Sequence, residues 1–114
     1  MRRKGMANIV VLALAATAFT APAMAGDQTG KVIVVAGDVG NPFVFSISGT
    51  RTAQPACAAD SFWAIPNPTS DNAKGLLSLV MTAFASNKTI IVHGNGGCNA
   101  TFTYREEVAY LMIQ

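Results

Sequence analysis

A single amphipathic helix between two apolar strands most constrains what this chain can fold into. The expected helix runs from about Ser70 to Asn87, between strand-like runs at 61–65 and 89–93. Its apolar residues recur at the spacing of one helical face: Leu76, Leu77, Val80, Met81 and Phe84. Ser70 or Asp71 can cap the start, and Asn87 can adopt the left-handed conformation that ends a helix. Because the apolar face needs a partner, we expect the helix to plug a small β-barrel.

The strand pattern around the helix predicts a mainly β fold. Runs rich in β-branched and aromatic residues, bounded by turn residues, predict strands at 31–36, 43–48, 62–65, 89–93 and 107–113. Three strands, one helix and two strands is the element order of the OB-fold, a five-stranded Greek-key barrel. A small open α+β sheet is the main alternative.

Residues 1–25 have the pattern of a secretory signal peptide. Basic residues at 2–4 precede an apolar run at 9–19, and the Ala-Met-Ala sequence at 23–25 is a small-x-small cleavage site. The apolar run is shorter than the roughly 20 residues that a spanning helix needs, so we favour a cleaved leader over a membrane anchor. We therefore expect an exported protein, periplasmic or secreted, with no membrane span after cleavage. Residues 26–114 form one domain in this interpretation, and 26–30 should be flexible.

The charge of the processed chain argues against a nucleic-acid partner. The formal net charge of +2 includes the three basic residues of the leader. From residue 26 onward five basic residues face six acidic ones, which gives a net charge of about −1. A surface that binds phosphates needs clustered Lys and Arg, and the sequence contains no such cluster after the leader.

Two cysteines, Cys57 and Cys98, follow the leader. An even number of cysteines in a small exported chain predicts one disulfide, which would contribute roughly 4 kcal/mol in the chain-entropy model. Two free thiols or half of a metal site are the alternatives. His93 is the only histidine and no further cysteine is present, so we expect no metal site.

The titratable residues do not suggest catalysis. Glu106 and Glu107 are neighbours, so on a strand they would point to opposite faces, and we expect both to be solvated. The glycine-rich run at 94–97 lacks the Lys-Ser/Thr of a phosphate-binding loop, so we expect a turn there. No serine stands in a nucleophile-elbow context. We therefore expect neither enzymatic activity nor a cofactor.

Aromatic side chains and the one histidine are candidates for ligand binding. Trp63, the only tryptophan, is either a core anchor beside the disulfide or an aromatic face for a sugar or a partner. Tyr104 and Tyr110 could serve in the same way. His93 is either a structural residue or one that orients a ligand.

Three passages together resemble the B subunits of subtilase-cytotoxin and pertussis-like toxins, over about residues 29–93. The first is Thr-Gly-Lys-Val-Ile-Val at 29–34, similar to the opening strand of that family. The second is Phe-Val-Phe-Ser-Ile-Ser-Gly at 43–49, similar to its second strand. The third is the succession of Cys57, Trp63 and a helix that ends at 82–88 before an apolar strand.

The resemblance implies an OB-fold, a ring of five subunits that can carry an enzymatic A subunit, and binding of sialylated host glycans. Thr29 stands where the family has a sugar-binding serine. Ser48 stands where it can carry an acidic residue, and His93 where it can carry a tyrosine. Ser46 replaces a family cysteine, which leaves Cys98 as the partner of Cys57.

The sequence therefore predicts an exported binding module for host or surface glycans, with Thr29, Ser48, Trp63 and His93 as its contact residues. The alternative is a periplasmic or secreted structural or protein-interaction domain that has no glycan partner and uses the edge of its barrel.

Overall fold

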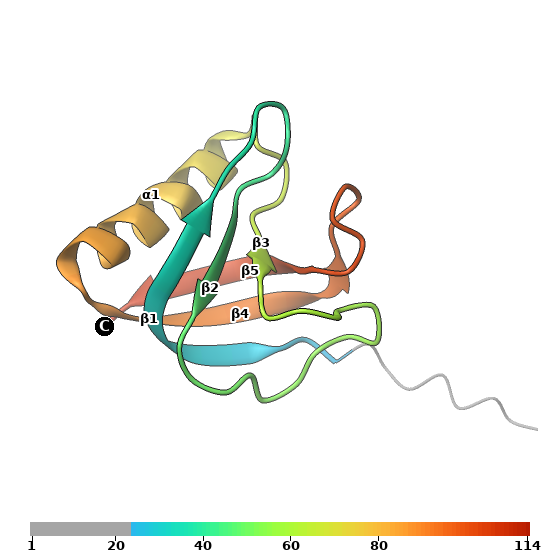
Figure 1. The fold of residues 1–114 in the computed structure, drawn as a ribbon, viewed down its shortest axis with the longest axis horizontal. Helices are drawn as coiled ribbons and strands as arrows, with labels where there is room; N and C mark the ends of the chain where they lie inside the picture. The colour runs from blue at the N-terminus through green and yellow to red at the C-terminus, as the bar shows by residue number, and fades with distance from the viewer. Residues whose placement is uncertain (1–23) are drawn as a thin grey trace, which may run out of the picture.

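The computed structural model describes residues 24–114, and residues 1–23 of the predicted leader lie outside this range. Five strands and one helix form the fold (Figure 1): β1 (Asp27–Ala36), β2 (Val44–Ile47), β3 (Trp63–Ala64), α1 (Asp71–Ser86), β4 (Thr89–Cys98) and β5 (Glu106–Ile113). This order of elements confirms the predicted one.

The five strands close into a barrel in the order β1-β2-β3-β5-β4. All neighbours are antiparallel except β3 and β5, which are parallel. β1 belongs to both halves of the barrel, because residues 27–31 pair with β4 and residues 32–36 pair with β2. An irregularity in register between Val32 and Val34 marks the bend between these halves. The closed OB-fold arrangement is thus confirmed over an open sheet.

Two strands are longer than predicted, and the extra residues matter for the site. β1 begins at Asp27, so most of the segment expected to be flexible is part of the sheet. β4 continues through the glycine-rich run to Cys98, so residues 94–97 are strand rather than a turn. Both extensions lie at the same end of the barrel, where Gly94 N donates to Gly26 O at 2.8 Å.

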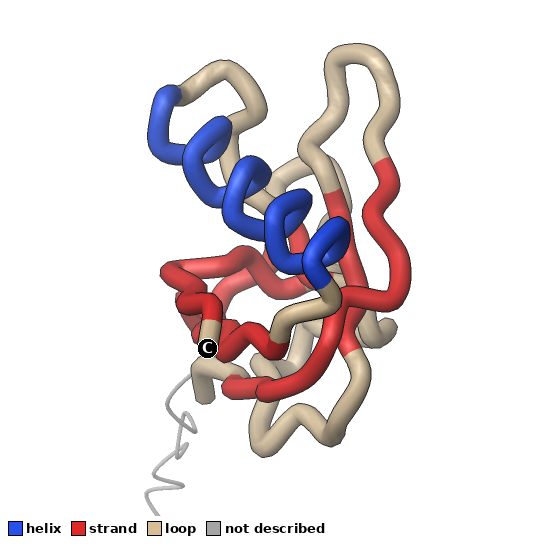
Figure 2. The backbone as a smooth tube through the Cα atoms, turned by 90° about the vertical axis from the view of Figure 1, so that its left-hand side faces the viewer, coloured by secondary structure: helices blue, strands red, loops and turns tan. Residues whose placement is uncertain are grey.

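α1 lies diagonally across one end of the barrel, against β1 and β5 (Figure 2). Ser70 caps its start, with Oγ accepting from Ala73 N at 3.1 Å, and Asn87 ends it in the left-handed conformation at φ 54°. Both predicted caps are therefore confirmed. In the described part of the chain, no helix is long and apolar enough to cross a bilayer.

The face that α1 buries differs from the predicted stripe. Val80 is fully buried, and Leu76 and Leu77 pack at the edge of the core. Met81 and Phe84, which we predicted to be buried, are about half exposed at 47% and 49%. Small residues take their place, because Ala73 and Ala83 face the core and let the helix approach the strands closely. The helix therefore covers the barrel as predicted, but the side of the helix that faces the barrel differs from the predicted one.

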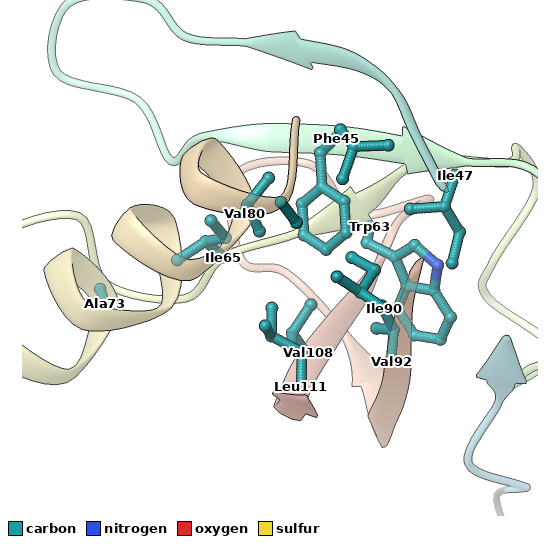
Figure 3. Close-up of a cluster of buried hydrophobic side chains, with 12 residues drawn as sticks. Phe45, Ile47, Trp63, Ile65, Ala73, Val80, Ile90, Val92, Val108 and Leu111 are labelled. Carbon is teal, nitrogen blue, oxygen red and sulfur yellow. The ribbon is translucent and has the colours of Figure 1, made fainter. Parts of the chain in front are cut away.

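The hydrophobic core fills the interior of the barrel and includes the buried face of α1 (Figure 3). Its largest fully buried side chains include an aromatic pair from β2 and β3 and aliphatic residues from α1, β4, β5 and the position just after β3: Phe45, Trp63, Ile65, Val80, Ile90, Val92 and Val108. At the opposite end from α1, the predicted disulfide joins Cys57 to Cys98 with a Cα–Cα distance of 6.2 Å. This bond ties the loop between β2 and β3 to the end of β4.

Candidate functional site

Thr29 and His93 lie on the outer face of the sheet formed by β1, β4 and β5. Gln28 and Val92 pair across β1 and β4 and are both buried. Neighbouring side chains on a strand point to opposite faces, so Thr29 and His93 point outward. Thr29 pairs with Ile91, two residues from His93 along β4. The structure thus brings these two predicted binding residues to one surface.

His93 has two close neighbours on this outer surface. Its Nδ1 contacts Asp27 Oδ1 on β1. Its ring stacks on Tyr110 of β5, with centroids 4.2 Å apart and an interplanar angle of 25°. Tyr110 is half exposed. The three side chains form an aromatic and polar patch on the surface, which we call the His93 patch.

Ser48 lies beyond β1 from this patch. It is exposed just after β2, and its Oγ accepts a hydrogen bond from Lys31 N at 2.9 Å. The chain next to it runs against Thr29: a β-carbon on Gly49, which has φ +88°, would lie 2.3 Å from Thr29 O. Ser48 is therefore near Thr29 but separated from His93 by the width of a strand.

Trp63 is buried inside the barrel and has no exposed surface. Its Nε1 donates to Gln28 Oε1 at 2.9 Å, and the Arg51 guanidinium lies over its ring, 3.8 Å from the centroid. The structure therefore corrects the placement of Trp63 among the sugar contacts. A ring that is enclosed on all sides cannot present a face to a sugar, and Trp63 is the core anchor of the alternative interpretation.

Gln28 connects this core residue to the surface. Its Nε2 donates to the carbonyl oxygens of Ile47 at 3.1 Å and Gly49 at 2.9 Å, while its Oε1 accepts from Trp63. Both ends of the carboxamide are thus satisfied, which fixes the side chain in one orientation. Sequence analysis missed Gln28 because the segment that holds it was expected to be flexible.

A polar pocket of about 310 Å³ opens beside Gln28. Its walls come from β1 and from two stretches of the β2–β3 loop: Gln28, Gly49, Arg51, Gln54, Ala59, Asp60 and Ser61. Cys57 lies between these two stretches, so the disulfide braces the loop that forms most of the wall. Two other hollows lie near the β1–β2 hairpin and offer few polar groups.

Two charged side chains in the pocket wall are held by neighbours. Burial lowers the pKa of the Arg51 guanidinium, and the Glu106 and Asp60 carboxylates act in the opposite direction. Asp60 accepts from Arg105 Nε at 2.9 Å and from Phe62 N at 3.0 Å. The wall therefore presents a cation and an anion that are both positioned by the fold. The sequence does not reveal the charged partners of either residue, because Arg105 and Glu106 lie far from Asp60 and Arg51 in the chain.

Glu106 lies next to Arg51 and is fully buried, which contradicts the expectation that it is solvated. Its Oε2 accepts from Gly26 N at 3.0 Å and from Gly96 N at 3.1 Å. Arg51 Nη1 lies 4.0 Å from its Oε1. The strand alternation was predicted correctly, since Glu107 is the more exposed of the two, but β5 turns Glu106 inward.

Within residues 24–114, no group of three or more His, Cys, Asp or Glu side chains is placed to hold a metal ion. The polar pocket and the His93 patch are the two candidate binding sites that these residues offer. Comparison of the chain with family models, with curated proteins and with solved structures gave no match.

Proposed function

We propose that this chain is an exported, non-catalytic binding module that holds a glycan in the polar pocket beside Gln28. One observation supports this most directly: carboxamide, hydroxyl, carboxylate and guanidinium groups from three segments converge on one pocket wall. Sugar hydroxyls both donate and accept hydrogen bonds, as the side chains of Gln54 and Ser61 do. The volume of about 310 Å³ lies at the lower end of the range for ligand sites, which suits a single sugar unit.

A sugar that carries a carboxylate fits this wall best. Arg51 supplies a guanidinium, and hydrogen bonds between a guanidinium and a carboxylate are stronger than those between neutral groups. The sialylated glycans implied by the family resemblance carry such a carboxylate. Because Arg51 and Asp60 are already fixed by Trp63 and Arg105, little conformational entropy would be lost on binding.

The predicted contacts Thr29 and Ser48 extend this site. Ser48 is next in sequence to Gly49 of the pocket wall, and Thr29, on the outer face of β1, lies against the same glycine, whose added β-carbon would be 2.3 Å from Thr29 O. In this proposal they contact sugar units beyond the one in the pocket. His93 lies two residues beyond Ile91, the β4 residue that pairs with Thr29, so it would contact only a longer chain of sugars.

A glycan array probed with the processed protein tests the proposal. We expect signal from carboxylated glycans, and we expect Ser61→Ala and Gln54→Ala to weaken the affinity by about 2- to 10-fold each, as loss of one net hydrogen bond implies. Both residues are exposed, so neither change should affect folding. Ser78→Ala is the matched control, because Ser78 is exposed on α1 and its Oγ bonds only to Lys74 O.

Further substitutions separate the pocket from the His93 patch. Loss of signal on Thr29→Ala alone would place the sugar on the outer face, and loss on His93→Ala alone would place it at the patch. An array without any signal, for a protein shown to be folded, would contradict glycan binding and favour the structural or protein-interaction alternative.

Self-association is a second proposal, supported by apolar side chains that the fold leaves exposed. They lie on β1, α1 and β5: Ile33, Val34, Met81, Phe84 and Met112. α1, which carries Met81 and Phe84, packs on both β1 and β5, the strands that carry the other three residues. Burying apolar surface between copies is favourable. We propose that this surface joins copies of the chain into the ring of five implied by the resemblance, with an enzymatic A subunit as its further partner and multivalent glycan binding as its result.

Light scattering of the processed protein tests this second proposal. We expect an assembly of five copies, and we expect Phe84→Asp to dissociate it because a carboxylate would be buried at the interface. Ser78→Asp adds the same charge elsewhere on α1 and should leave the assembly intact. A monomer at micromolar concentration would contradict the proposal.

A further inference from the structure

Only one of the two oxygens of the buried Glu106 carboxylate accepts hydrogen bonds from the described residues. Its Oε2 accepts from two backbone amides, Gly26 N and Gly96 N. Its Oε1 accepts no hydrogen bond, and Arg51 Nη1, 4.0 Å away, donates none. A buried ionised carboxylate is costly unless a cation and hydrogen bonds compensate for the lost water. Glu106 Oε1 can therefore accept a hydrogen bond from a further donor or pair with a further positive charge.

Gly26 brings the chain directly onto this carboxylate. It is buried, whereas Met24 and Ala25 before it are exposed, so the chain reaches the barrel at Gly26. A β-carbon at Gly26 would lie 2.7 Å from Glu106 Oε1 and 2.3 Å from Ala53 O. Only glycine fits at this position. The nitrogen of the same residue is the one that donates to Glu106 Oε2 at 3.0 Å.

The bond that the sequence predicts to be cleaved is the bond to this nitrogen. The small-x-small pattern at 23–25 puts the cut between Ala25 and Gly26. We propose that signal-peptide cleavage converts the Gly26 amide into an α-ammonium group that binds Glu106 as a buried ion pair, so that processing completes the fold. This inference relies on the predicted cleavage site and is independent of the proposed glycan.

The chemistry of the step is a simple hydrolysis. Water adds across the Ala25–Gly26 peptide bond, the carboxyl group leaves with the leader, and the released amine of Gly26 takes up a proton. In the precursor this nitrogen offers one hydrogen and no formal charge. After cleavage it offers three hydrogens and a positive charge, which can serve both oxygens of Glu106.

The charges around this site favour an additional cation. Glu106 faces Arg51 from β5, and Arg51 is also influenced by Asp60 in the pocket wall. Asp27 adjoins Gly26 and points to the outer face. The ammonium group would thus contact the Glu106 carboxylate directly, with the Arg51 guanidinium on the other oxygen of Glu106. We expect the processed protein to be more stable than a chain whose Gly26 nitrogen remains in an amide.

The experiment begins with the full precursor expressed in an exporting bacterium. The intact mass of the purified product should correspond to residues 26–114 with one disulfide; a product that begins elsewhere would overturn the inference at its first step. An α-amine is acylated selectively near pH 7, because lysine side chains are more basic. We expect acylation of the Gly26 amine to be at least about tenfold slower in the folded protein than in urea.

Acylation in urea followed by refolding then separates ion pairing from simple burial. Acylation removes the charge of the amine, so it should lower Tm by about 5 °C or more in the unsubstituted protein. In Glu106→Gln the same modification should cost clearly less, because its partner charge is absent. Glu107→Gln is the matched control and should behave like the unsubstituted protein.

Two further results would overturn the proposal. One is equal reactivity of the amine in the folded protein and in urea. The other is an equal Tm loss on acylation with and without the Glu106 carboxylate. If Glu106→Gln does not fold, acylation of the unsubstituted protein decides the question: a Tm loss well below about 5 °C would overturn the ion pair.

Discussion

At the scale of single residues, the interior is organised by polar groups rather than by apolar ones alone. Gln28 joins Trp63 to the backbone at the end of β2, and Glu106 joins Gly26, just before β1, to β4. Both side chains are buried, and each bridges segments that are far apart in sequence. Such contacts fix the register of a small barrel, because a shift by one residue would leave buried polar groups without partners.

Replacement of Gln28 by alanine tests this role. The Trp63 N–H would be left without its acceptor inside the barrel, and we expect a loss of about 2–3 kcal/mol in the free energy of unfolding. Urea unfolding followed by tryptophan fluorescence measures it. Gln54→Ala, at an exposed position, should change it by less than about 0.5 kcal/mol. Equal midpoints for the two variants would show that the Gln28 bonds contribute nothing.

The single residues were also the hardest to predict. Nothing local in the sequence distinguishes Glu106 from Glu107, and the partners of Glu106 come from both ends of the fold. Thr29, Ser48 and His93 were named as sugar contacts through the family resemblance, and the face on which Thr29 lies was not predicted because its segment was expected to be flexible. Burial of Trp63 depends on closure of the barrel around it.

At the scale of elements, α1 shows which signals in a sequence are dependable. Its ends were predicted because Ser70 and Asn87 act through local hydrogen bonds and local backbone conformation. Its buried face was misjudged at Met81 and Phe84, because hydropathy gives weight to large side chains. Ala73 and Ala83 are buried since their small size allows close packing, and that depends on the shape of the barrel.

A pair of adjacent substitutions on α1 tests this assignment of its faces. Val80→Ala removes two methyl groups from a fully buried position, and we expect a loss of about 1–3 kcal/mol in stability. Met81→Ala should change stability by less than about 0.5 kcal/mol, because Met81 is half exposed. Thermal unfolding of the monomeric state compares them. A larger loss for Met81→Ala would show that Met81 is buried, as the sequence predicted.

The extension of β4 has a similar explanation. Glycine-rich sequences usually indicate turns, which is why residues 94–97 were expected to leave the sheet. In the structure a β-carbon on Gly94 would lie 1.8 Å from Glu106 Oε2. Glycine is needed here for the close approach of a buried side chain to a strand, a requirement that only the tertiary structure reveals.

At the scale of the whole molecule, the two ends of the barrel are stabilised by different means. α1 covers one end with apolar side chains, and the Cys57–Cys98 disulfide braces the other, where the polar pocket opens. Fold class, element order and disulfide were all predictable, because each depends on patterns that extend over many residues. The pocket was not, since its walls come from segments that meet only after folding.

Removal of the disulfide tests whether this bond stabilises the end of the barrel opposite to α1. The double substitution Cys57→Ser with Cys98→Ser should reduce the free energy of unfolding by about 2–5 kcal/mol, because a long loop of the unfolded chain is released. Denaturant titration measures the loss, and reduction of the unsubstituted protein with a thiol is the control for the added hydroxyls. A change below about 1 kcal/mol in both would contradict a stabilising role.

The placement of the two chain ends determines how the barrel responds to force. β1 and β5 both lie antiparallel to β4, with Asp27 opposite His93 in the middle of β4 and Ile113 opposite Ile90 near its start. A pull that separates the ends therefore acts along the strands and loads both ladders in shear, so many hydrogen bonds resist at once. The same barrel pulled across its strands would unzip one bond at a time.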